Sequence, residues 1–174
     1  MNGLVLAGGQ SIRMGYDKAL IAYHGVPQYV YIYEMLQKIC DHVLISSREQ
    51  KYPLPTLLDD SKYNRMGPMA GLLTAFDYQE TDWLVIAIDY PLVTKEDVEK
   101  LTQPHTGLSS VYFHPDTEFY EPFLACYRQE FKCLLTAEYE LGNTSMQNLL
   151  RRADIHKIIP ENLNLLKSVD YPPS

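Results

Sequence analysis

The sequence predicts an α/β fold in which helices cover both faces of a mostly parallel sheet. Short apolar runs alternate with segments whose apolar residues recur at helical spacing, and this alternation is typical of βαβ units. Residues 83–88 are apolar throughout, as expected for a central strand that is buried on both sides. The 174 residues have the length of one ordinary domain, so we expect residues 1–174 to fold as a single domain.

The N-terminal half is predicted to alternate strands with two helices. Apolar residues spaced i, i+3, i+4, i+7, i+10 and i+11 from Tyr29 predict a helix over residues 29–40. A second helix is expected to begin at Gly67-Pro68, because proline suits the first helical turn. Strands are expected at residues 4–7, 42–46, 56–58 and 83–88, with a glycine-rich loop after the first and a short extended piece at 19–23.

The C-terminal half is predicted to add three strands and three helices. Thr94 and Asp97 have the spacing of a capping box, which predicts a helix that runs to Leu101. Apolar spacing from Phe131 marks another helix, and Ser145 is expected to cap the last one. Strands are expected at residues 109–113, 122–127 and 155–159.

Composition and charge exclude several classes of protein. The formal net charge of -7 argues against a protein that binds nucleic acid through clustered lysines and arginines. Three cysteines without CxxC spacing favour reduced thiols over a zinc site or disulfides. No basic leader precedes the first strand, and no run approaches the roughly 18 apolar residues of a membrane helix. We therefore expect a cytoplasmic protein that binds neither nucleic acid nor a membrane.

A glycine-rich loop directly after the first strand is the most informative segment. Residues 6–18 read LAGGQSIRMGYDK, so Gly8 and Gly9 allow the backbone to approach a ligand and to form an anion-binding concavity. Lys18 adds a mobile charge suited to a polyphosphate, and Arg13 adds a forked cation. The segment matches neither GxxxxGK[ST] nor GxGxxG. The alternative is a tight turn with a solvated arginine and lysine, but the ordered set favours phosphate binding.

A carboxylate at the end of the central strand predicts a metal site. Asp89 follows residues 83–88, and side chains at the carboxyl ends of parallel strands border the ligand crevice. Carboxylate oxygens suit Mg²⁺, which often bridges one or two carboxylates to phosphates. The alternative is a structural turn before Pro91. Considered together with the phosphate-binding loop, Asp89 is the expected Mg²⁺ ligand.

The stretch LAGGQSIRMGYDKAL resembles the signature loop LAGGxSxRMGxDKxL of the MobA-like NTP transferases, the molybdenum cofactor guanylyltransferases. The resemblance extends from the first strand to about Asp170, and its specific motifs lie in the first 18 residues and around Asp89. It implies a Rossmann-like fold with a mixed, mostly parallel sheet, as in nucleotide-diphospho-sugar transferases. Related cytidylyltransferases usually carry LAAG, so the Gly8-Gly9 pair favours GTP.

The resemblance also implies a set of site residues. Asp89-Tyr90-Pro91 resembles the family's D-x-P element, whose aspartate binds magnesium. Asp170 resembles a second metal ligand, although Ser168 stands where the family usually has asparagine. The expected catalytic residues are Lys18, Arg13 and Asp89. The expected nucleotide-binding residues are Leu6, Ala7, Gly8, Gly9, Lys18, Ser46, Asp60 and Asp89.

Two further segments resemble the family without a settled role. Residues 67–73, GPMAGLL, match its GPLAGLL-like element. This helix N-terminus could face a ligand, or Gly71 could serve only the close packing of the helix. Glu121 lies in a strand that also resembles the family, and we assign it no chemical role because a strand-edge carboxylate before proline is usually structural.

The resemblance implies a Mg²⁺-dependent transfer of GMP from GTP to molybdopterin, which usually already carries molybdenum, with release of pyrophosphate. The expected partners are these substrates and, transiently, proteins of cofactor biosynthesis or molybdoenzymes. Two alternatives stay open. One is a cytidylyl- or sugar-nucleotidyltransferase of the same fold, and the other is a nucleotide-binding module without catalysis.

Overall fold

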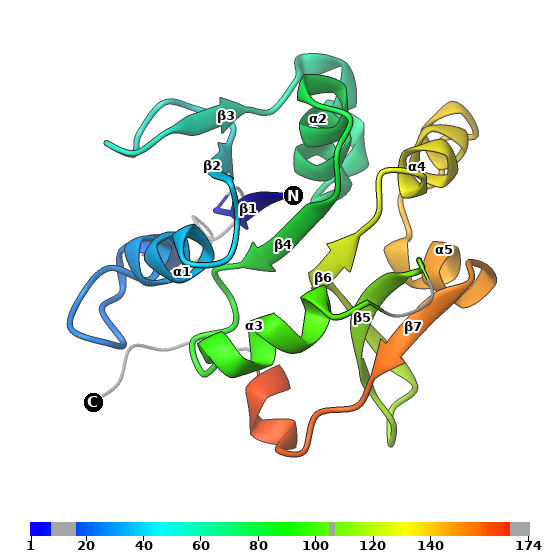
Figure 1. The fold of residues 1–174 in the computed structure, drawn as a ribbon. Helices are drawn as coiled ribbons and strands as arrows, with labels where there is room; N and C mark the ends of the chain where they lie inside the picture. The colour runs from blue at the N-terminus through cyan, green and yellow to red at the C-terminus, as the bar shows by residue number, and fades with distance from the viewer. Residues whose placement is uncertain (8–16, 105–106, 168–174) are drawn as a thin grey trace.

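The computed structural model describes residues 1–7, 17–104 and 107–167 (Figure 1). In these residues seven strands form one sheet, with the strand order β3-β2-β1-β4-β6-β5-β7. The strands are β1 (Asn2–Leu6), β2 (His42–Ser47), β3 (Thr56–Leu58), β4 (Trp83–Ala87), β5 (Ser109–His114), β6 (Phe119–Tyr127) and β7 (Ile155–Ile158).

The sheet is mixed and mostly parallel, as the sequence predicted. Neighbouring strands pair parallel except on both sides of β6, which is antiparallel to β4 and to β5. Strand β1 lies between β2 and β4, with Leu6 opposite Ser46 on one side and Ala87 on the other. The carboxyl ends of β2, β1 and β4 therefore lie side by side, where α/β sheets of this kind bind ligands.

Helices cover both faces of the sheet (Figure 1). One face carries α1 (Gln28–Gln37) and α3 (Lys95–Thr102), and the other carries α2 (Met69–Tyr78), α4 (Phe131–Glu140) and α5 (Met146–Arg152). Three 3-10 helices complete the described chain: η2 (Lys18–Leu20), η3 (Ser61–Met66) and η4 (Leu163–Leu166). Strand β4 is buried over its whole length because both layers pack on it.

Helix boundaries follow local capping signals. Thr94 forms the predicted capping box with Asp97 at the start of α3, and the Ser145 side chain accepts a hydrogen bond from the Asn148 backbone at the start of α5. Helix α1 begins at Gln28, one residue before the predicted start, and ends at Gln37, three residues before the predicted end. No helix in the described ranges is both long and apolar enough to span a bilayer.

Other predicted segments also differ from the structure. The piece 19–23 was expected to be extended, but Lys18–Leu20 is a 3-10 helix because Asp17 Oδ1 accepts a hydrogen bond from the Ala19 backbone N–H. Strand β6 begins at Phe119, three residues before the predicted start. Its pairing with β5 shifts register between Val111 and Tyr112, and this irregularity allows Pro122 inside a strand.

Candidate functional site

The backbone ladder continues beyond the strands at the centre of the carboxyl edge. The Ala7 backbone N–H donates to the Ser46 carbonyl at 3.2 Å, and the Ile88 N–H donates to the Leu6 carbonyl at 3.2 Å. Leu6 and Ala7, both predicted nucleotide contacts, are thus held between the ends of β2 and β4. The glycine-rich loop leaves the sheet from this central position, next to the turn that carries Asp89.

Lys18 and Asp89 come together across this edge although they are 71 residues apart in the sequence. Lys18 Nζ lies 3.4 Å from Asp89 Oδ1, with side-chain exposures of 18% and 47%. Asp17 fixes the start of η2 by capping Ala19, and its second oxygen pairs with Lys51 Nζ at 2.9 Å. Lys18 therefore extends from an anchored turn, and the exposed Asp89 oxygens face solvent where a cation or phosphate can approach.

The turn after Asp89 is held by side chains from the α1 region. Gln28 is fully buried at this contact, and among the residues that the structure describes its Oε1 has no hydrogen-bond partner. His24 stacks on Tyr31 with ring centroids 3.9 Å apart. The contacts to carbonyl oxygens of the turn are Gln28 Nε2 to Tyr90 at 3.4 Å, His24 Nε2 to Pro91 at 2.6 Å and Tyr31 Oη to Val93 at 3.2 Å. Asp89 thus precedes a turn that three side chains hold through its carbonyl oxygens.

Tyr90 and Glu121 form a second support behind this turn. The Tyr90 hydroxyl donates to Glu121 Oε2 at 2.8 Å. Burial raises the pKa of both groups, and the nearby Glu121 carboxylate raises the pKa of Tyr90 further. The phenol therefore stays protonated and donates, which agrees with a structural use of Glu121.

Ser46 and Asp59 form a polar pair at the ends of β2 and β3. Ser46 is 1% exposed, and its Oγ donates to Asp59 Oδ1 at 2.7 Å. Burial raises the pKa of Asp59, while the hydrogen bond from Ser46 and the positive charge of Arg48 oppose that rise. Ser46 lies on β2, next to β1, and Asp59 follows β3, two strands from β1, where the glycine-rich loop starts.

Asp60 is the predicted nucleotide contact at this place, and its neighbour Asp59 has no predicted role. In the structure the Asp60 side chain accepts from the Lys62 backbone N–H at 2.9 Å and so caps η3, and it also pairs with Lys62 Nζ at 3.4 Å. It is Asp59 that contacts Ser46. Two adjacent carboxylates after a short strand carry no local signal that tells which one points toward the neighbouring strand.

Gly71 allows α2 to pack closely against the carboxyl edge. A Cβ at this position would lie 2.3 Å from Ser46 Oγ and 2.9 Å from Leu6 Cδ2, closer than such atoms approach in proteins. Of the two roles considered for this segment, the structure therefore supports close packing at Gly71. Gly67 before the helix has φ +57°, a conformation that favours glycine.

Several predicted residues lie outside the described ranges: Gly8, Gly9, Arg13 and Asp170. Within those ranges no group of three or more His, Cys, Asp or Glu side chains could hold a metal ion. Asp89 fits Mg²⁺ by its chemistry, because it presents carboxylate oxygens to solvent at the strand edge. A Mg²⁺ site here would take its remaining ligands from phosphates, water or residues outside the described ranges.

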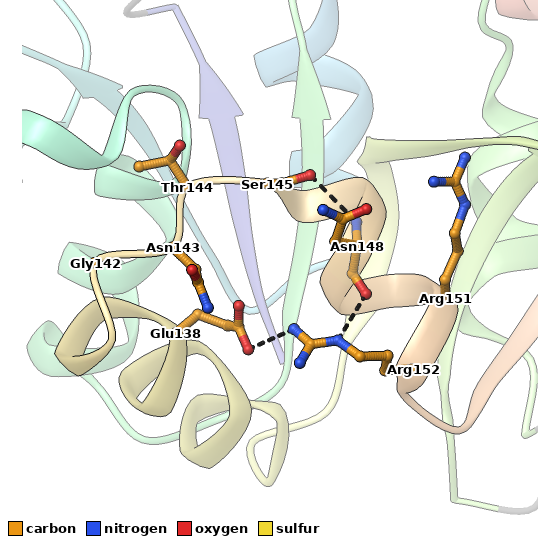
Figure 2. A pocket seen from close by; sticks show the side chains of 8 residues that line it. All are labelled: Glu138, Gly142, Asn143, Thr144, Ser145, Asn148, Arg151 and Arg152. Atoms are coloured by element: carbon orange, nitrogen blue, oxygen red, sulfur yellow. Dashed lines mark hydrogen bonds and ion pairs between the residues drawn. The ribbon is translucent and has the colours of Figure 1, made fainter.

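A separate polar cavity of about 620 Å³ opens between α4 and α5 (Figure 2). Figure 2 shows Arg152 reaching from α5 to Glu138 on α4, where its Nη2 lies 2.6 Å from Glu138 Oε1. The Arg152 Nε also donates to the Asn148 carbonyl at 3.1 Å. The cavity lining includes none of the predicted site residues.

Comparisons with known proteins agree with this architecture. The molybdenum cofactor biosynthesis bifunctional protein of Synechocystis sp. is 37% identical over 98% of this chain, and the chain spans about half of that relative, 51% of its length. The molybdenum cofactor guanylyltransferase of Pseudomonas entomophila is 28% identical over 84% of this chain and 80% of its own length.

Solved structures share the fold. Molybdopterin-guanine dinucleotide biosynthesis protein A from Archaeoglobus fulgidus matches with a TM-score of 0.75 and 20% identity, over 99% of this chain and 93% of that one. The 2-C-methyl-D-erythritol 4-phosphate cytidylyltransferase from Thermus thermophilus matches with a TM-score of 0.70 and 12% identity, over 97% and 92%. The sequence model of the MobA-like NTP transferase domain matches residues 3–157, and the chain therefore belongs to the MobA-like NTP transferase family.

Proposed function

We propose that the protein transfers GMP from GTP to molybdopterin, with or without bound molybdenum, and releases pyrophosphate. The observation that carries the proposal is the approach of Lys18 Nζ, on η2, to Asp89 Oδ1, just after β4, with the two atoms 3.4 Å apart. A cation for the phosphates and a carboxylate for a metal thus lie at one edge. The relatives named molybdenum cofactor guanylyltransferase supply the acceptor in this proposal.

The reaction is a single displacement at phosphorus. An oxygen of the molybdopterin phosphate forms a bond to the α-phosphorus of GTP, and the bond from that phosphorus to the bridging oxygen of the β-phosphate breaks. The electron pair leaves with pyrophosphate. The acceptor phosphate is already ionised at neutral pH, so the proposal needs no general base. Positioning and charge neutralisation are then the main contributions of the protein.

Each site residue has a role in this scheme. The amides of Gly8 and Gly9, with Arg13 and Lys18, bind the triphosphate. Leu6, Ala7, Ser46 and Asp60 are assigned to contacts with the nucleoside. Asp89, with Asp170 as a second candidate ligand, would hold Mg²⁺, which when bound neutralises charge on the α-phosphate and the attacking oxygen.

The experiment measures pyrophosphate release from GTP with a molybdopterin acceptor and Mg²⁺. Lys18→Ala and Asp89→Ala are each expected to lower turnover by about 100-fold or more, because each removes charge stabilisation of the transition state. The ion pair is partly exposed, so its loss changes the free energy of unfolding by only about 1 kcal/mol or less. Lys38→Ala, at an exposed helix end, is the matched control. Unchanged turnover in either site variant would refute the proposal.

Two rival functions give different results in the same system. A cytidylyl- or sugar-nucleotidyltransferase would be stabilised more by CTP or UTP than by GTP in a thermal-shift series with Mg²⁺. A nucleotide-binding module without catalysis would bind GTP and release no pyrophosphate. The proposal includes a cytoplasmic location and transient contact with proteins that supply molybdopterin or receive the product.

A further inference from the structure

We infer that Glu121 is a positioning residue for Asp89, because it holds the hydroxyl of Tyr90, the residue that directly follows Asp89. The inference rests on the proposed function, since it takes Asp89 as the ligand of Mg²⁺. It goes beyond support of the turn: the hydrogen bond between Tyr90 and Glu121 sets the direction in which the Asp89 carboxylate meets a cation. In the predicted site Glu121 has no chemical role.

Asp89 lies between two residues that anchor the chain in the core. Ile88 and Tyr90 are buried, whereas the side chain of Asp89 is 47% exposed. The backbone of Asp89 therefore takes the conformation that its two buried neighbours impose. A displacement of either neighbour would turn the exposed carboxylate, so the contacts of Ile88 and Tyr90 decide where it points.

The bond to Glu121 is the shortest hydrogen bond of Tyr90 among the described residues. The Tyr90 backbone N–H reaches the Ala87 carbonyl at 3.5 Å. Its carbonyl accepts at 3.4 Å both from Gln28 Nε2 and from the Val93 N–H. These distances exceed the roughly 2.7–3.2 Å of ordinary N–H···O bonds, whereas the hydroxyl lies 2.8 Å from Glu121 Oε2. Tyr90 is thus held more firmly through its hydroxyl than through its backbone.

Glu121 is a firm support because its backbone belongs to the sheet. Ile86 of β4 lies opposite Leu124 of β6, and the two strands are antiparallel, so the part of β6 before Leu124 extends past the end of β4. Glu121 lies in that part, next to the turn, and on its other side it pairs with Tyr112 of β5. The carboxylate that holds Tyr90 is therefore presented by a paired strand.

The carboxylate and the hydroxyl depend on each other. Glu121 is half-buried, and burial raises its pKa, while the hydrogen bond from Tyr90 and the nearby His114 oppose that rise. If Tyr90 moved away, the carboxylate would lose the donor that compensates for its burial. The pair therefore resists displacement of the turn when a cation and phosphates bind beside it.

Groups behind a metal ligand often decide how well the metal binds. Loss of such a support typically lowers metal affinity by about 10–100-fold, because the ligand is no longer held in the required direction. Glu121 acts on Asp89 through the next residue and does not contact the Asp89 carboxylate itself. We therefore expect an effect at the low end of that range.

The experiment measures by calorimetry how much Mg²⁺ tightens the binding of GTP, without acceptor. This tightening is the dissociation constant of GTP in EDTA divided by that in excess Mg²⁺, so it isolates the contribution of the metal. Tyr90→Phe and Glu121→Ala are each expected to reduce the tightening about 10-fold and to change GTP binding in EDTA by less than about 2-fold. Glu121→Gln should stay within about 3-fold of the unaltered protein, because its amide oxygen still accepts from the hydroxyl.

Tyr63→Phe is the matched control, because Tyr63 makes the same kind of bond with a different carboxylate. Tyr63 is 6% exposed, against 7% for Tyr90, and its hydroxyl donates to Asp77 Oδ2 at 2.6 Å. Loss of this bond should lower the Tm but leave the tightening by Mg²⁺ unchanged. If the bond of Tyr90 served only the stability of the fold, Tyr90→Phe would give that same result.

The outcomes separate this inference from the proposed function. Unchanged tightening in folded Tyr90→Phe would overturn the inference; if that variant does not fold, Glu121→Ala decides in the same way. An equal loss in Glu121→Gln and Glu121→Ala would also overturn it, because the charge and not the hydrogen bond would then act. If Asp89→Ala keeps the tightening, Asp89 is not the ligand and both proposals fall. Absence of pyrophosphate release with molybdopterin would refute only the proposed transfer and leave the comparison of variants standing.

Discussion

Gly71→Ala tests whether the carboxyl edge depends on the close approach of α2. The new Cβ would lie 2.3 Å from Ser46 Oγ, so the hydroxyl must rotate away and lose its 2.7 Å hydrogen bond to Asp59. A hydrogen bond to a charged group contributes about 1.5–3 kcal/mol. The contact with Leu6 Cδ2 at 2.9 Å adds overpacking of about 1 kcal/mol, which the higher helix propensity of alanine offsets.

The expected net loss is therefore about 2 kcal/mol in the free energy of unfolding. For a chain of 174 residues this corresponds to a fall in Tm of about 4–8 °C. Urea unfolding gives the free energy, and calorimetry gives the Tm.

A double-mutant cycle with Ser46→Ala identifies the cause. Once the hydroxyl is absent, Gly71→Ala should change the free energy of unfolding by less than about 1 kcal/mol, so the coupling energy is about 1–2 kcal/mol. An equal loss in both backgrounds would show that the hydroxyl contact is not responsible. A rise in Tm for Gly71→Ala alone would refute the reasoning, because helix propensity would then dominate over packing.

Two further predictions concern carboxylates at the same edge. Asp17→Ala should lower the free energy of unfolding by about 1–2 kcal/mol in urea and weaken GTP binding, because it removes the cap of the turn that starts at Lys18. Lys51→Ala removes only a partly exposed ion pair and should have an effect below about 1 kcal/mol; equal effects of the two variants would contradict the capping role. Burial raises the pKa of Asp59 in the folded state, so stability from this group is fully present below the unfolded pKa and declines as pH rises through the folded pKa. Asp59→Asn should therefore gain stability relative to the unaltered protein as the pH rises above about 4, the ordinary pKa of aspartate, in urea titrations. A difference in stability that does not change with pH would show that the carboxylate is not desolvated.

Much of the fold could be predicted because its signals are local. The apolar run of β4, the capping box of α3 and the apolar spacing of α1 each reside within a few consecutive residues. The start of β6 was harder to predict from the sequence, because proline usually marks the beginning of a strand. Pro122 can lie inside β6 because the pairing with β5 shifts register there. The prediction of an extended segment at residues 19–23 was wrong for a related reason, because the cap from Asp17 starts a 3-10 helix there.

By itself, the sequence determined that a glycine-rich loop ending near Lys18 follows a buried strand and that Asp89 stands at the end of another strand. It could do so because strand periodicity and turn residues act over short distances. Only the tertiary structure decided that Asp59, not Asp60, contacts Ser46, and that Gly71 is required by packing rather than by conformation. Both outcomes depend on how β3 aligns beside β2 and how closely α2 lies upon them. Such alignments are set by contacts between segments far apart in the chain, which no local pattern encodes.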